Sequence, residues 1–140
     1  MPPPLLAQLA PAVDGIRLTI HVLAAAVWVG GQATIAGLLP TVRDLGSDAP
    51  RKVARAFSRL SWPAYFVVVA TGIWNVAAVH AGQPDSWQIL LAIKIAVVAV
   101  AGIAAWLHGI ASSRTGLAVW GAIMAVASMA ALVMGVFLAG

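Results

Sequence analysis

Cysteine is absent from the sequence, and charged residues are scarce. Without cysteine there are no disulfide bonds, thiolate metal sites or cysteine nucleophiles, so a transition metal must be held by histidine, methionine, carboxylate or backbone ligands. Only 9% of the residues are charged, whereas a soluble domain carries about 25%. Because 62% of the residues are hydrophobic, the composition predicts an integral membrane protein.

Long polar linkers are also missing, and the apolar residues form four stretches at about 15–39, 60–80, 87–111 and 116–139. Each stretch holds roughly 20 residues or slightly more, which matches a hydrocarbon core about 30 Å thick. We expect Pro40 to end the first span, because proline cannot continue the helical hydrogen bonds. Asp48 and Pro50 mark the start of the next helix. The chain is predicted to form one all-α domain over residues 1–140, a transmembrane four-helix bundle.

Basic residues are concentrated in or beside the first and third connections between these stretches. They are Arg43, Arg51, Lys52, Arg55, Arg59 and Arg114. The positive-inside rule places both connections in the cytoplasm and both termini outside, which gives an N-out/C-out protein of the bacterial plasma (inner) membrane. The lipid bilayer is then its main partner. The basic residues indicate topology, and no aromatic platform accompanies them to suggest a nucleic-acid surface.

His21 is the first candidate site residue, because an imidazole within an apolar span has no water to bind and needs a partner or a metal. His21, Trp28 and Gln32 are spaced at i, i+7 and i+11, so they share one helical face. That face carries an imidazole, an indole N–H and an amide. We therefore predict that it points into the bundle.

Lys94, Thr71 and Asn75 are predicted to lie at the depth of His21, roughly 10 Å below the outer surface. An ammonium group costs several kcal/mol inside a membrane unless it is paired or reaches the headgroups. Lys94 is thus either a functional cation, with Asp14 or Asp85 as candidate counter-ion, or a side chain that extends to the outer surface. Thr71 and Asn75 either belong to the site or bond a neighbouring helix.

Further candidate ligands lie nearer the ends of the spans. His80 is either a metal ligand or an interfacial anchor at the outer boundary, and His108 is a boundary histidine at the opposite end. Met124, Met129 and Met134 are spaced by five residues. This spacing spreads them around a helix, which favours packing over a thioether ladder for Cu(I).

Four segments resemble, in the same order, parts of the copper-resistance CopD-type membrane domain: residues 21–31 (HVLAAAVWVGG), 55–60 (RAFSRL), 71–75 (TGIWN) and 90–95 (LLAIKI). The similarity covers about residues 18–110. The first-span histidine together with the third-span lysine also resembles the HemJ-type protoporphyrinogen oxidases, which are small four-helix haem proteins. These resemblances imply that His21 is a metal or haem ligand and that Lys94 is a functional cation.

Three functions follow as hypotheses. A copper-handling protein for uptake or resistance would bind a copper ion through His21 with help from Asn75, His80 or a methionine, and an extracytoplasmic copper-binding protein would be its partner. A haem b protein or oxidoreductase would use His21 as the axial ligand and pair Lys94 with an acidic group of the haem or porphyrin, with Trp28 packing the macrocycle. In the third hypothesis the polar residues only pack, and the chain is a structural subunit of a larger membrane complex or a homo-oligomer.

Overall fold

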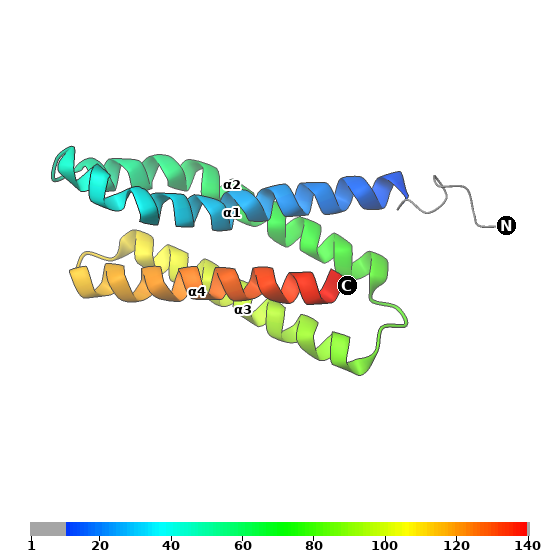
Figure 1. The fold of residues 1–140 in the computed structure, drawn as a ribbon. Helices are drawn as coiled ribbons and strands as arrows, with labels where there is room; N and C mark the ends of the chain where they lie inside the picture. The colour runs from blue at the N-terminus through cyan, green and yellow to red at the C-terminus, as the bar shows by residue number, and fades with distance from the viewer. Residues whose placement is uncertain (1–10, 140) are drawn as a thin grey trace.

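Four long α-helices make up nearly all of residues 11–139, the part of the chain that the computed structural model describes. They are α1 (Ala12–Asp44), α2 (Ala49–Val79), α3 (Asp85–Ile110) and α4 (Arg114–Ala139). Figure 1 shows two helical hairpins, α1 with α2 and α3 with α4, that lie one above the other. The predicted all-α class and four-helix arrangement are confirmed. Each helix is long and apolar enough to cross a membrane.

The start of α2 follows the sequence signal, and the end of α1 does not. Asp48 is the N-cap residue of α2, and Pro50 lies in its first turn, where a missing backbone N–H leaves no hydrogen bond unmade. Pro40, in contrast, lies inside α1, which continues to Asp44. The prediction that Pro40 ends this helix is wrong. A long apolar helix can continue through a proline when neighbouring groups satisfy the backbone carbonyl that is left free.

The first hairpin meets α3 through an aromatic cluster formed by Trp28, Trp62, Tyr65 and Phe66. The ring centroids of Trp28 and Tyr65 are 4.8 Å apart, and those of Trp62 and Tyr65 are 5.8 Å apart. The Tyr65 hydroxyl donates a hydrogen bond of 2.9 Å to the Val98 carbonyl of α3. The Tyr65 ring lies directly against Gly102, where a Cβ would collide with it. A glycine on α3 thus allows a tyrosine on α2 to approach closely.

Contact between the two hairpins also runs through α1 and α4. The Trp28 indole N–H donates to the Ser128 hydroxyl at 2.9 Å, and the Gln32 amide donates to the same oxygen at 3.3 Å. Both Trp28 and Ser128 are buried. The prediction that the Trp28 and Gln32 face of α1 points into the bundle is therefore confirmed.

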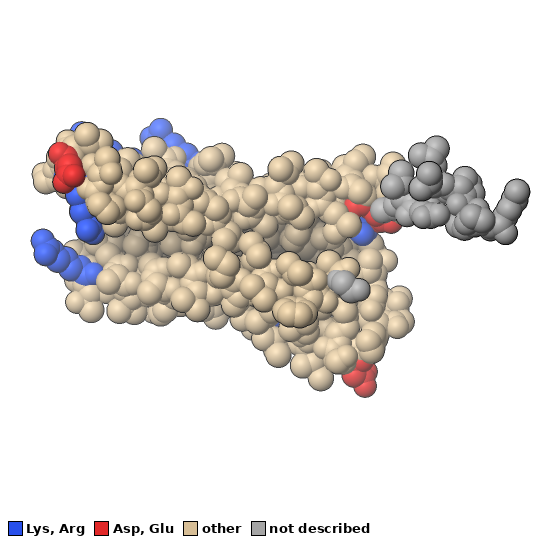
Figure 2. Space-filling model, viewed as in Figure 1, with Lys and Arg blue, Asp and Glu red and all other residues tan. Residues whose placement is uncertain are grey.

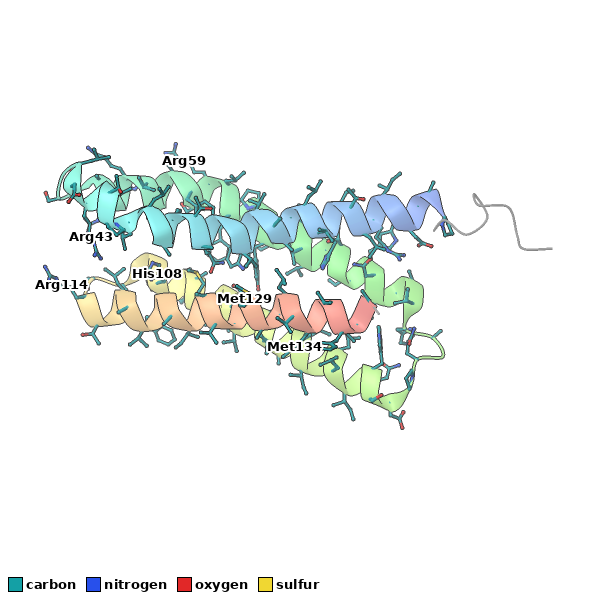
Figure 3. All side chains as sticks on the ribbon, in the orientation of Figure 1. Arg43, Arg59, His108, Arg114, Met129 and Met134 are labelled. Atoms are coloured by element: carbon teal, nitrogen blue, oxygen red, sulfur yellow. The ribbon has the colours of Figure 1, made fainter. Side chains whose placement is uncertain are left out.

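The two ends of the bundle differ in charge. Lys and Arg gather at the end that holds the α1–α2 and α3–α4 connections, which we call the basic end (Figure 2). Arg43 of α1 and Arg114 of α4 both lie at this end (Figure 3). The opposite end, where α1 begins and α4 ends, is called the N/C end. Its basic residues, Arg17 and Lys94, are buried and half-buried.

Candidate functional site

His21 projects from α1 toward α2, and its Nδ1 lies 2.8 Å from the Thr71 hydroxyl oxygen. The Thr71 hydroxyl donates its own proton to the Val67 carbonyl at 2.6 Å. With the hydroxyl proton directed to this carbonyl, Thr71 accepts from His21, and the matching tautomer of the imidazole donates through Nδ1–H. In the neutral ring this leaves the lone pair on Nε2. An imidazole whose N–H is held in this way is oriented as metal-binding histidines usually are.

Two contacts of α4, one with α1 and one with α3, place Lys94 at the level of His21. The bond between Trp28 and Ser128 fixes α1 against α4. Seven residues toward the N/C end, about 10.5 Å, lead to His21 on α1 and to Gly135 on α4. A Cβ added to Gly135 would lie 3.0 Å from Lys94 Nζ, so the ammonium group rests against α4 at this level.

Glycines leave room beside both side chains. Gly72 follows Thr71 on α2, and a Cβ there would lie 3.6 Å from His21 Cε1. Gly135 plays the same part for Lys94 on α4. The two glycines therefore allow the His21 ring to lie close to α2 and the Lys94 ammonium group to lie close to α4.

Neither predicted counter-ion pairs with Lys94. Asp14 instead bonds Arg17, with 3.0 Å between the carboxylate and guanidinium, and Asp85 is exposed in the first turn of α3. Within residues 11–139 Lys94 makes no ion pair and no side-chain hydrogen bond. The ammonium group of Lys94 rests against Gly135 of α4, which lies at the level of His21. It is therefore at the depth of His21.

Arg17 is a site residue that the sequence analysis did not identify. Its side chain is 5% exposed and faces inward one helical turn from His21. Its Nε–H finds no hydrogen-bond partner in the described part of the chain. The i, i+4 spacing from His21 was the available signal, since residues four apart share a helical face.

Asn75 lies at the level of Arg17. The antiparallel pairing of His21 with Thr71 means that four residues outward on each helix, about 6 Å, lead to Arg17 and Asn75. The buried Asn75 Oδ1 also lacks a hydrogen-bond partner among residues 11–139. The N/C end of the bundle therefore contains two buried polar atoms with unused hydrogen-bonding capacity on facing helices.

The other candidate residues lie away from this level. His80 is exposed at the end of α2, nine residues or about 13.5 Å along the chain from Thr71. The indole N–H of Trp87 donates to the Leu138 carbonyl at 3.1 Å, and Trp28 belongs to the aromatic cluster. His108 Nδ1 bonds the Leu117 carbonyl at 2.9 Å, which ties α3 to α4.

Metal ligands are sparse around His21. No three His, Asp or Glu side chains come together as a metal-binding group in the described residues. Met129 is exposed, and Met134 is half-buried on α4.

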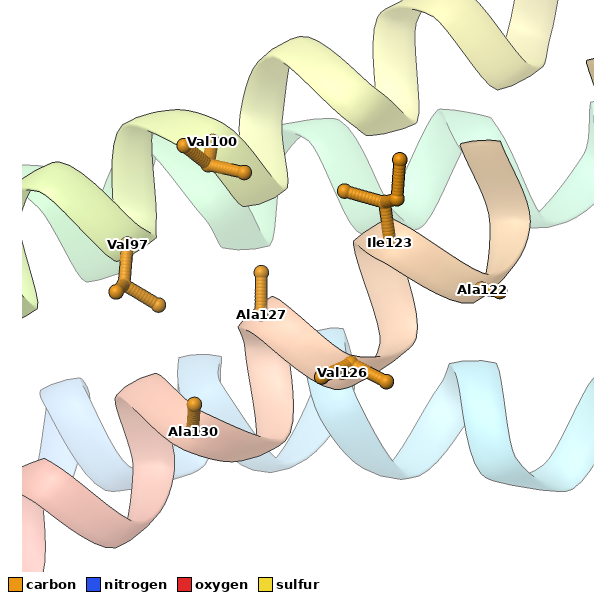
Figure 4. Close-up of a pocket in the computed structure, with 7 residues that line it drawn as sticks. All are labelled: Val97, Val100, Ala122, Ile123, Val126, Ala127 and Ala130. Carbon is orange, nitrogen blue, oxygen red and sulfur yellow. The ribbon is translucent and has the colours of Figure 1, made fainter. Parts of the chain in front are cut away.

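Two surface grooves are apolar and separate from the polar residues. One lies between α3 and α4 (Figure 4), lined by Val97, Val100, Ala122, Ile123, Val126, Ala127 and Ala130. The other lies between α1 and α2 and includes Leu23, Pro63 and Val67. Neither groove includes His21, Arg17 or Lys94. Their apolar linings suit hydrocarbon chains, and the residues that line them carry no polar or charged side chain.

Together the fold and the site define an all-α four-helix protein with long apolar helices and a cluster of polar and basic side chains near one end. Comparison with protein-family models, with curated proteins and with solved structures finds no match to the chain.

Proposed function

We propose that this chain is an integral membrane protein that binds haem b through His21. The observation that carries the proposal is the 2.8 Å contact between His21 Nδ1 and the Thr71 hydroxyl oxygen, which, with the proton on Nδ1, leaves Nε2 available as a ligand. Haem needs only an axial ligand from the protein, because the porphyrin supplies four nitrogens to the iron. A copper site usually draws two or more ligands from the protein, and the described residues bring no second histidine to His21.

The residues around His21 fit such a group in three ways. Gly72 and Gly135 add no side-chain bulk beside the His21 ring and the Lys94 ammonium group. The unpaired ammonium group of Lys94 can neutralise an acidic group of the ligand. Figure 2 shows a hollow between the two hairpins. A bound haem supplies one-electron redox chemistry, while the protein orients the ligand and excludes water.

The proposed orientation follows the charge distribution. The basic end faces the cytoplasm of a bacterial cell and the N/C end faces outward, which is the N-out/C-out arrangement that the positive-inside rule gives. The exposed cations then meet cytoplasmic headgroups. The site of His21 and Lys94 lies in the outer half of the bilayer.

The test is absorption spectroscopy and metal analysis of the full chain, purified from cells that are supplied with both copper and a haem precursor. We expect a Soret band with about one haem per chain, which His21→Ala abolishes. His108→Ala is the matched control, because it removes an imidazole whose contact is with α4, and it should retain the band. Bound copper without a Soret band would favour a copper-handling protein. Neither ligand would favour a structural subunit.

A further inference from the structure

We propose that Arg17 is a second anion-binding residue of this site, so that the ligand presents two acidic groups, one to Arg17 and one to Lys94. The inference rests on the proposed function in taking haem b, which carries two carboxylates, as that ligand. It adds a residue that the sequence analysis did not identify as part of the site.

The position of the Arg17 side chain is the first argument. Arg17 lies in the second turn of α1, close enough to the helix start that its long side chain could extend into water. Its neighbours Ile16 and Leu18 are 58% and 42% exposed, whereas Arg17 is 4% exposed. The guanidinium is therefore turned inward although an outward path is near.

The unused hydrogen-bonding capacity is the second argument. A guanidinium stays charged in proteins and has five N–H donors. One guanidinium nitrogen of Arg17 pairs with Asp14, whose side chain is 39% exposed. The Nε–H of Arg17 has no acceptor among the described residues. A buried charged donor without a partner is costly. An additional carboxylate would satisfy it, and a planar guanidinium binds carboxylates well.

The balance of charge is the third argument. Arg17 and Lys94 bring two positive charges to the N/C end, and only Asp14 is paired with either of them. In a poorly solvated site an uncompensated cation attracts an anion strongly. Asn75 adds a buried amide at the level of Arg17, and because the two ends of an amide are interchangeable in assignment, it can offer an N–H to the same anion.

Arg17 and Lys94 come from different hairpins, on α1 and α3. Arg17 already bonds Asp14 through one nitrogen, so a ligand with a single acidic group on Lys94 would leave the Arg17 Nε–H without an acceptor. A ligand with two carboxylates, placed between the hairpins, compensates both.

The experiment compares haem b with haem dimethyl ester, in which both carboxylates are blocked. Each is titrated into the full-length wild type and three variants. We expect Arg17→Met to weaken haem binding by about tenfold or more, as for loss of a charge-assisted pair. Ester binding should change little. Asp14→Asn should strengthen haem binding, because it removes the carboxylate that competes for Arg17, and should leave ester binding unaltered. Arg59→Met, which removes an exposed arginine at the basic end, is the control and should bind as wild type does.

Equal weakening of haem and ester binding by Arg17→Met would overturn the inference, because it would assign Arg17 a purely structural role. Asp14→Asn then weakens both ligands too, since it breaks the same ion pair. If Arg17→Met does not fold, the opposite signs expected for Asp14→Asn decide the matter alone. Failure of the proposed function is a separate result: wild type would bind neither ligand in a His21-dependent way, and both proposals would fall together.

Discussion

At the level of single residues, Thr71 fixes the chemistry available to His21. Its hydroxyl lies within hydrogen-bond distance of the helix backbone and of the imidazole, and a hydroxyl that donates to the backbone favours the tautomer with the proton on Nδ1. Thr71→Val keeps the shape of the side chain and removes the acceptor. We expect haem affinity to fall by about 10- to 100-fold, the usual cost of losing such a support. Titration followed at the Soret band measures it, with Thr71→Ser, which keeps the hydroxyl, as the control. Unchanged binding by the valine variant would mean that packing alone orients the ring.

Lys94 offers a second residue-level prediction, which separates a working cation from one that only fills space. Lys94→Met keeps most of the stem and removes the charge, so haem affinity should fall by at least about tenfold, or about 1.4 kcal/mol. Lys94→Arg should restore binding only in part, because its planar fork replaces a point charge. Affinity and thermal stability are measured side by side. A methionine variant that is more stable and binds equally well would leave Lys94 without a role.

The shared depth of His21 and Lys94 could be predicted from the sequence, whereas the hydrogen-bond partners of the polar residues could not. His21 and Lys94 stand out because a polar group in an apolar span is costly, and helical rise alone gives their depth. Arg17 was overlooked because a cation near the end of a span reads as a topology signal, and only the folded chain shows its side chain turned inward. Ser128 could not be assigned to Trp28 from the sequence, because their contact spans one hundred residues.

At the level of helices, two adjacent glycines on α1 have different surroundings. A Cβ on Gly30 would meet nothing within 4 Å, whereas a Cβ on Gly31 would collide with the Phe57 ring of α2. Close approach of α1 and α2 therefore depends on Gly31. Small residues in an apolar span permit such close approach, but the sequence alone does not show which of the two glycines faces α2.

Alanine substitutions of these glycines should therefore have opposite effects. Gly31→Ala gains up to about 1 kcal/mol of helix propensity but overpacks the interface at a cost of about 1–3 kcal/mol, so stability should fall. Gly30→Ala gains the same propensity without the clash and should be neutral or stabilising. Thermal denaturation of both variants in the same detergent measures the difference. Equal melting temperatures would show that Phe57 moves aside at little cost.

The prolines show that short sequence signals predict the start of a helix better than its end. Asp48 and Pro50 mark the start of α2 as expected, because a helix start is determined by a few neighbouring residues. Pro40 and Pro63 both lie within helices, because the remaining hydrogen bonds and the apolar flanks outweigh the loss of a single N–H. Whether a helix ends inside an apolar span therefore depends on tertiary contacts and on the solvent, which a short stretch of sequence does not reveal.

For the whole molecule, the exposed surface is the main argument for a membrane. Large apolar side chains are widely exposed on all four helices, including Val22, Phe66, Ile103 and Phe137, which are 58–71% exposed. Soluble monomers rarely expose continuous apolar surface on this scale. Few side chains are buried, because the helices contact one another only through a small core of alanines and aromatic rings.

The orientation of that molecule gives the last prediction, and a chain without cysteine is well suited to test it. Single cysteines are introduced as Ser47→Cys in the α1–α2 connection, Ser112→Cys in the α3–α4 connection and Gln83→Cys in the α2–α3 connection. Because the basic residues flank the first two, the positive-inside rule places them in the cytoplasm and Gln83 outside. An impermeant thiol reagent applied to intact cells should label only Gln83→Cys, and all three variants should react after the cells are lysed. Labelling of the two serine variants in intact cells would invert the protein and place the site of His21 in the inner half of the bilayer.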